Sequence, residues 1–195
     1  MVGLMIIAFA LSRVPGLLPP GFSPVYAFAF CAGAFLKRSA AWLLPLGVVI
    51  ATDVVLNFFV YDVSVINGYT LLNYAGLVVI IGLGRLFSAR SSFLGLLGGG
   101  ILGALLFYLI TNTGSWIQDP LYPKTFAGWV QALTSGIPGF PPTWMFFRNT
   151  LLGGGLFTGL FVGAMKFSEA MEPEEEAETE EEAEEPEAAS EESRA

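Results

Sequence analysis

Most of the first 168 residues of this chain belong to apolar stretches that approach or reach the length of a bilayer crossing. A lipid core of about 30 Å is spanned by a helix of about 20 mostly apolar residues. Six stretches approach or reach that length, at residues 2–14, 20–36, 40–61, 69–87, 92–112 and 144–167. We therefore predict an all-α fold, an integral membrane bundle of about six transmembrane helices that occupies residues 1–168.

Charge divides the chain into two different parts. Of the 17 acidic residues only Asp53, Asp62 and Asp119 precede residue 169, so residues 1–168 have a net charge of about +5 although the whole chain carries -8. The other 14 lie in residues 169–192, a segment without aromatic residues that cannot bury enough surface to offset chain entropy. We predict that residues 169–195 form a disordered acidic cytoplasmic tail, either solvated or in contact with a basic partner.

The basic residues predict the orientation of the bundle. Lys and Arg are enriched in cytoplasmic loops of membrane proteins. Alternate connections hold Lys37 and Arg38, then Arg85 and Arg90, and Lys166 follows the last stretch. We therefore expect both termini to be cytoplasmic, in a bacterial inner (plasma) membrane, with residues 1–12 retained as a first helix. The outward connections would carry Arg13, Asp62, Asp119 and Lys124.

The composition argues against several classes of protein. There is no histidine, which is the commonest general base and zinc ligand, and the one cysteine, Cys31, lies in an apolar run. We therefore expect no enzyme activity, no bound metal and no cofactor. Nucleic acid is not an expected partner either, because the basic residues lie in short loops and the largest soluble segment is acidic.

Polar residues inside or beside the apolar stretches are candidates for a binding site. A charge at the bilayer centre costs about 2.5 to 3.5 kcal/mol on insertion scales, which makes Asp53 the strongest candidate. If the topology is right, polar groups gather at its outer level and could bind a polar or charged small molecule. A structural ion pair of Asp53 with Arg13 or Arg148 is the compatible alternative. The candidate substrate-binding residues are Arg13, Ser23, Asp53, Asn57, Asn73, Asn112, Trp116, Tyr122, Lys124, Arg148 and Asn149.

Three further features have two interpretations each. Residues 125–137 are too short to span comfortably, which is typical of an interfacial or a re-entrant helix. Trp116 and Tyr122 in the preceding connection are either interfacial anchors or part of a lid over a ligand. Glycines at four-residue spacing allow close helix packing within the chain or a docking face for a partner membrane protein. These helix-packing glycines are Gly99, Gly103, Gly155, Gly159 and Gly163.

Four segments resemble those of an uncharacterised bacterial family of multi-pass membrane proteins that are described as transport proteins. They are FSPV (22–25), TNTGSW (111–116), LYPKTFAG (121–128) and FRNTLLG (147–153), and the resemblance covers most of residues 5–165. Where the family has an aspartate after its NTLLG run this chain has Gly154, and residues 139–145 look inserted before Phe146. In size and helix number the family is similar to the substrate-binding (S) components of energy-coupling factor transporters.

The resemblance implies an S-component-like subunit that captures a small solute from the outer side. Its partners would be the lipid bilayer, the solute and a membrane coupling subunit with ATPases. A membrane scaffold or assembly protein that acts through its glycine-rich helix faces and acidic tail is the alternative, because neither feature needs a ligand.

Overall fold

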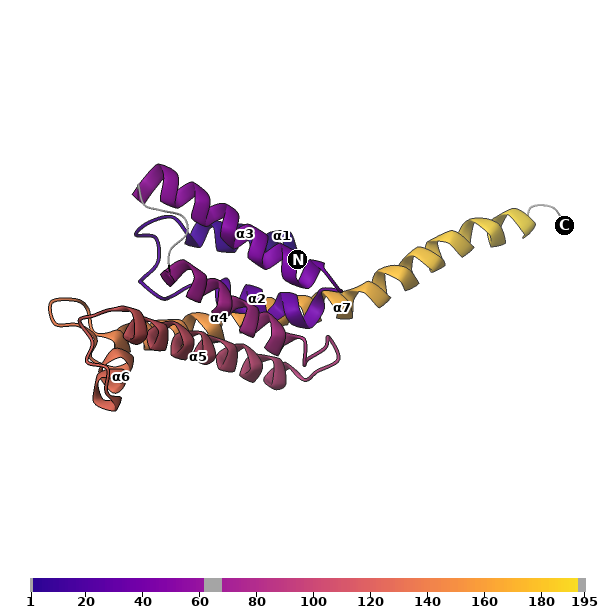
Figure 1. The fold of residues 1–195 in the computed structure, drawn as a ribbon. Coiled ribbons are helices and arrows are strands. Elements are labelled where there is room, and N and C mark those ends of the chain that lie inside the picture. The colour runs from indigo at the N-terminus through magenta and orange to yellow at the C-terminus, as the bar shows by residue number, and fades with distance from the viewer. Residues whose placement is uncertain (1, 62–67, 193–195) are drawn as a thin grey trace. The chain divides into compact units, whose positions relative to one another are not determined.

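The computed structural model describes the backbone of residues 2–61 and 68–192, so Asp62 lies outside the described residues. Within those ranges every element is helical, as predicted. The elements are α1 (Val2–Ser12), α2 (Val25–Phe35), α3 (Ala40–Leu56), the π-helical turn η1 (Asn57–Tyr61), α4 (Gly68–Gly84), α5 (Phe93–Gln118), α6 (Phe126–Leu133) and α7 (Thr143–Glu192) (Figure 1).

The chain divides within α7 into two units, Met1–Val162 and Gly163–Ala195. The described part of the second unit is the C-terminal portion of α7. The expectation of a disordered tail over residues 169–195 stays a prediction.

Three helical segments are long and apolar enough to cross a membrane: Ala40–Tyr61, Phe93–Gln118 and Thr143–Ser168. The helices α1 and α2 have only 11 residues each, and α4 has 17. An 11-residue helix is about 16 Å long, roughly half of a lipid core. The predicted count of six spans is therefore not confirmed for the described residues.

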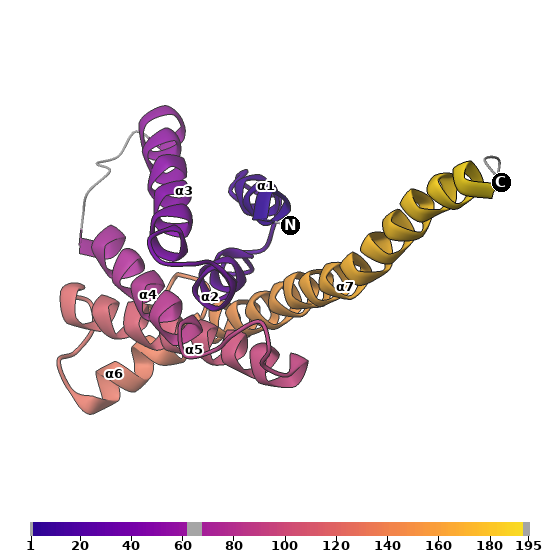
Figure 2. The same cartoon turned by 90° about the vertical axis from the view of Figure 1, so that its right-hand side faces the viewer.

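The short helix α2 is the centre of the first unit. It contacts α1, α3, α4 and α5, and the views in Figures 1 and 2 place it among them. The eight residues from Tyr26 to Gly33 are all buried. Aromatic side chains join α2 to its neighbours, with Phe28 near Phe9 and Phe30 against Phe87 at centroid distances of 6.1 and 5.2 Å.

The predicted start of this helix, residue 20, is wrong by five residues. Pro24 precedes the first turn, and Gly16 and Gly21 both have φ of +80°, a backbone conformation that a right-handed helix excludes. Residues 13–24 therefore form an irregular connection. Pro24, at the end of this connection, is buried, whereas Val14 and Leu17 are 51% and 57% exposed.

Glycines permit close helix contacts in the first unit. At the crossing of α2 and α4, a Cβ on Gly33 would lie 3.0 Å from the Cα of Gly84 and clash with the Ile81 carbonyl oxygen. In lipid there is little hydrophobic force between helices, so close van der Waals contact of this kind stabilises the crossing. Neither glycine belongs to the four-residue pattern singled out in the sequence.

The structure places the five glycines of that pattern in different surroundings. A Cβ on Gly99 would meet the Phe30 and Phe87 rings, and one on Gly103 would lie 3.1 Å from Ile80. These α5 glycines therefore pack against the chain itself. A Cβ on Gly155 or Gly159 would make only ordinary contacts, with Ile101 at 3.5 Å and Leu97 at 3.8 Å respectively, and Gly163 opens the second unit.

Candidate functional site

The described candidate residues lie at one end of the first unit, which we call the polar end. There Arg13 pairs with Asp53, and the Nδ2 atom of Asn149 donates to the Pro20 carbonyl at 2.9 Å, which ties the start of α7 to the connection before α2. The loops of the other end hold Lys37, Arg38, Arg85 and Arg90, and Arg85 donates to the Leu36 carbonyl at 3.1 Å. Asp53 thus shares an end with Arg13 and Arg148.

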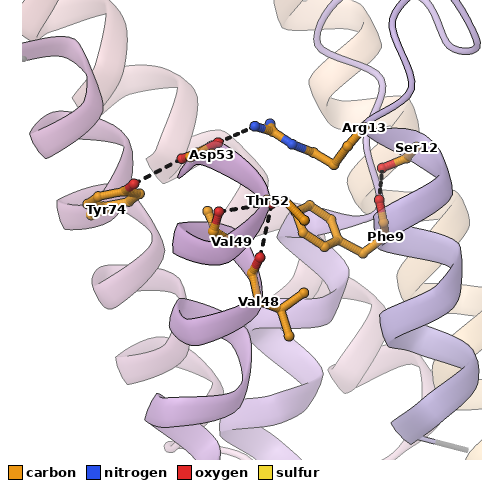
Figure 3. Close-up of polar contacts among 8 residues, drawn as sticks. All are labelled: Phe9, Ser12, Arg13, Val48, Val49, Thr52, Asp53 and Tyr74. Carbon is orange, nitrogen blue, oxygen red and sulfur yellow. Dashed lines mark hydrogen bonds and ion pairs between the residues drawn. The ribbon is translucent and has the colours of Figure 1, made fainter. Parts of the chain in front are cut away.

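At the polar end an ion pair joins α3 to the residue after α1, and a hydrogen bond joins α3 to α4 (Figure 3). Arg13 pairs with the Oδ1 atom of Asp53, and the Tyr74 hydroxyl donates to Oδ2 at 3.0 Å. The side chains of Arg13 and Asp53 are 33% and 15% exposed. Among the described residues the buried Nε atom of Arg13 has no acceptor. The geometry therefore favours the structural ion pair, with Arg13 as the partner.

Arg148 is not part of this pair. Its guanidinium donates to the Oδ1 atom of Asn149 at 3.3 Å and lies 5.6 Å from the centroid of the Trp144 ring. Arg13 borders one of the two pockets of this end, and Asn112 borders the other. The polar end holds two separate groups of side chains.

The first group borders a groove of about 330 Å³ between α1 and α3. Arg13 and Thr52 are its polar lining residues, and the Thr52 hydroxyl donates to the carbonyls of Val48 and Val49 at 2.9 Å. Asn57 is half-buried where α3 passes into η1, and Asn73 is exposed on α4. Because the rest of the lining is apolar, this groove offers a polar solute few contacts.

The second group lines a cavity of about 400 Å³ between the end of α5 and the start of α7. Its walls come from the end of α5, the connection that follows α5, and the segment that leads into α7. The polar lining residues are Asn112, Asp119, Tyr122 and Thr143, and the apolar ones are Ile137, Phe140, Pro141 and Phe146. This mixture of an apolar surface with a few convergent polar groups is typical of small-molecule sites, whose volumes run from about 300 to 1,000 Å³.

Hydrogen bonds within the connection after α5 fix the position of Tyr122. The Nζ atom of Lys124 donates to the carbonyls of Asp119, at 2.6 Å, and Trp116, while the indole of Trp116 donates to the Pro123 carbonyl at 2.8 Å. Trp116 and Lys124 therefore shape the turn, and Tyr122 is only 7% exposed. Whether Trp116 and Tyr122 also anchor the chain at a membrane interface stays a prediction.

Tyr122 presents a neutral hydroxyl at neutral pH. Burial raises the pKa of its phenol above the ordinary value, a hydrogen bond with the Thr143 side chain lowers it in part, and the nearby Asp119 carboxylate raises it again. A phenol with a raised pKa stays protonated, so the hydroxyl can both donate and accept hydrogen bonds.

Two hydrogen bonds join α5 to α6 beside the cavity. The Tyr108 hydroxyl donates to the Leu133 carbonyl at 2.7 Å, and Trp129 donates to the Thr113 hydroxyl at 3.0 Å. The predicted helix at residues 125–137 corresponds to α6, whose N-cap is the Thr125 side chain, which accepts from Gly128 N at 3.1 Å. It ends before Gly136, which has a φ of +72°. Whether α6 lies at a membrane surface stays a prediction.

Sequence reasoning missed three polar residues of the polar end. Tyr74 lies in an apolar stretch, where only its hydroxyl could have indicated a second partner for Asp53 beside an arginine. Asp119 was noted as an outward acid but not as a site residue. Thr143 belongs to the segment 139–145 that looked inserted, and that segment supplies three lining residues of the cavity. Ser23, by contrast, caps its own turn by accepting from Val25 N at 3.2 Å.

The helices are those of a membrane protein. Within the described residues the chain is all-helical, and three segments have the length and composition of membrane spans. The chain belongs to DUF6580, a family of unknown function whose model matches residues 1–175. No curated protein and no solved structure matches the sequence. The description of the family names no activity, so function has to be argued from the site.

Proposed function

We propose that this protein is the solute-binding part of a membrane transport system and that it binds a small solute in the cavity between α5 and α7. The observation that supports this proposal is the polar and apolar lining of a 400 Å³ cavity at the polar end. The alternative, a scaffold that docks partners on its glycine faces, has less support, because Gly99 and Gly103 pack against side chains of the same chain.

The orientation belongs to the same proposal. Lys37, Arg38, Arg85 and Arg90 lie at the end opposite the polar end, and the positive-inside rule puts such loops in the cytoplasm. The cavity would then open to the outer side of a bacterial inner membrane, and both termini would be cytoplasmic. A coupling subunit with ATPases would supply the energy for release of the solute inside.

Ligand stabilisation of the full chain in lipid nanodiscs tests this function. We expect at least one member of a library of amino acids, amines, nucleobases, vitamins and divalent metal ions to raise the unfolding temperature. A solute at a hundredfold excess over its dissociation constant stabilises the folded state by about 2.7 kcal/mol. Asn112→Leu should abolish the shift, since Asn112 lines the cavity.

Asn73→Leu is the matched control, because the same substitution falls on an exposed residue of α4. It should leave the ligand-induced shift unchanged. A library without any stabilising solute, or equal shifts for Asn112→Leu and the unmodified protein, would contradict the proposed function.

A further inference from the structure

The electrostatic character of the cavity narrows the class of solute. Of the residues that the structure describes, Asp119 is the only charged one that lines it. The Oδ1 atom of Asp119 accepts from Leu121 N at 2.9 Å, and among the described residues its carboxylate makes no ion pair. The ammonium of Lys124 bonds the backbone carbonyl of Asp119 instead, so the carboxylate keeps an oxygen available to a ligand.

The neutral polar groups of the cavity add hydrogen-bond acceptors. Asn112 donates through Nδ2 to the Tyr108 carbonyl at 2.9 Å, and this bond fixes the amide because a carbonyl can only accept. No described residue donates to the amide oxygen of Asn112, so this oxygen can accept from a ligand. Tyr122 and Thr143 also line the cavity, and each hydroxyl can donate or accept a hydrogen bond. The carboxylate of Asp119 would repel an anion, whereas a cationic N–H group finds acceptors on Asp119 and Asn112.

The remaining lining suits the apolar body of such a solute. Phe140 and Phe146 both border the cavity, and aromatic faces attract cations within about 6 Å of the ring. A bare metal ion is a poor fit, because the described residues contain no group of three or more His, Cys, Asp or Glu side chains that could hold one.

Resting on the proposed function, we infer that the solute is a small organic cation, an ammonium or guanidinium group on an apolar body. Its cationic N–H group hydrogen bonds the carboxylate of Asp119 and the amide oxygen of Asn112, and its apolar part lies against Phe140 and Phe146.

Three probes of similar shape and different charge test this inference: phenethylammonium, 2-phenylethanol and phenylacetate. Binding to the full chain in nanodiscs of zwitterionic phosphatidylcholine is measured by calorimetry, so that anionic lipid does not attract the amine. We expect phenethylammonium to bind at least tenfold more tightly than the alcohol and phenylacetate to bind most weakly. Asp119→Asn should weaken amine binding about tenfold, while its amide oxygen can still accept from Leu121 N.

Glu182→Gln is the charge-matched control, because it removes one negative charge from the second unit. Equal binding of the three probes, or equal losses of amine binding in Asp119→Asn and Glu182→Gln, would overturn the inference. If the probes fail while a neutral or anionic library solute binds at Asn112, this inference is wrong and the proposed function stands. If the whole library fails as well, the proposed function is wrong too.

Discussion

Gly33→Ala and Gly84→Ala are each expected to destabilise the first unit by about 1 to 3 kcal/mol or more. A Cβ on either residue would clash with a backbone carbonyl oxygen of the facing helix. Other backbone atoms would lie 3.0 to 3.2 Å from it, which is closer than ordinary van der Waals contact. Backbone atoms cannot rotate away as a side chain can, so α2 and α4 would have to move apart. Their contact buries the core of the first unit, and moving them apart would loosen it. The unfolding temperature of the purified chain in detergent, followed by circular dichroism, measures the loss.

Gly47→Ala and Gly98→Ala are matched controls for this experiment. Both glycines lie inside helices, α3 and α5, and a Cβ on either would have no neighbour within 4 Å. Alanine is intrinsically favoured over glycine in helices by about 1 kcal/mol, so these variants should be as stable as the unmodified protein or slightly more stable. Equal stability of Gly33→Ala and Gly47→Ala would show that the α2–α4 crossing is not closely packed.

Asp53→Asn is the second substitution from which we expect a large effect. It leaves the Arg13 guanidinium without its counter-charge in a partly buried position, and Arg13→Gln does the same to the carboxylate. Removing one partner of a buried pair costs more than the pair contributes, and since Arg13 is one-third exposed we expect about 1 to 3 kcal/mol for each single variant. Thermal unfolding of both variants in the same detergent measures these losses.

The double variant Arg13→Gln, Asp53→Asn separates a structural ion pair from two independent contributions. With neither charge left unpaired, it should be more stable than the sum of the two single losses predicts. Strict additivity would contradict direct coupling of the two side chains. Solute binding offers a further comparison: because this pair lies apart from the α5–α7 cavity, the double variant should bind the solute with unchanged affinity.

The sequence predicted helix limits correctly where a helix coincides with one apolar stretch. The predicted stretch at residues 40–61 corresponds to α3 and η1 with the same limits. The end of α5 was placed six residues too early, because threonine, asparagine and serine often end helices. Here Thr111, Asn112 and Ser115 bond carbonyls one turn back, at 2.9 to 3.1 Å, and the helix continues to Gln118.

The composition of the site was harder to predict than its location. Successive helices of a bundle run in opposite directions, so the order of the helices alone predicts that Asp53 and Arg148 lie at the same end. Which arginine pairs with Asp53 depends on how each helix is rotated about its axis, and the apolar stretches carry little of that information because most of their faces are apolar. Thr143 and Phe140 lie in a segment without periodicity, so their place in the cavity wall required the tertiary structure.

The length of α2 has a consequence for biosynthesis. A helix of 11 residues is too short to be released alone into lipid, yet α2 leaves the ribosome before α3, α4 and α5, the helices that cover it. We therefore expect stable placement of α2 in a bilayer to require α4 and α5, which are translated after it. Until then we expect the nascent chain to depend on the insertion machinery.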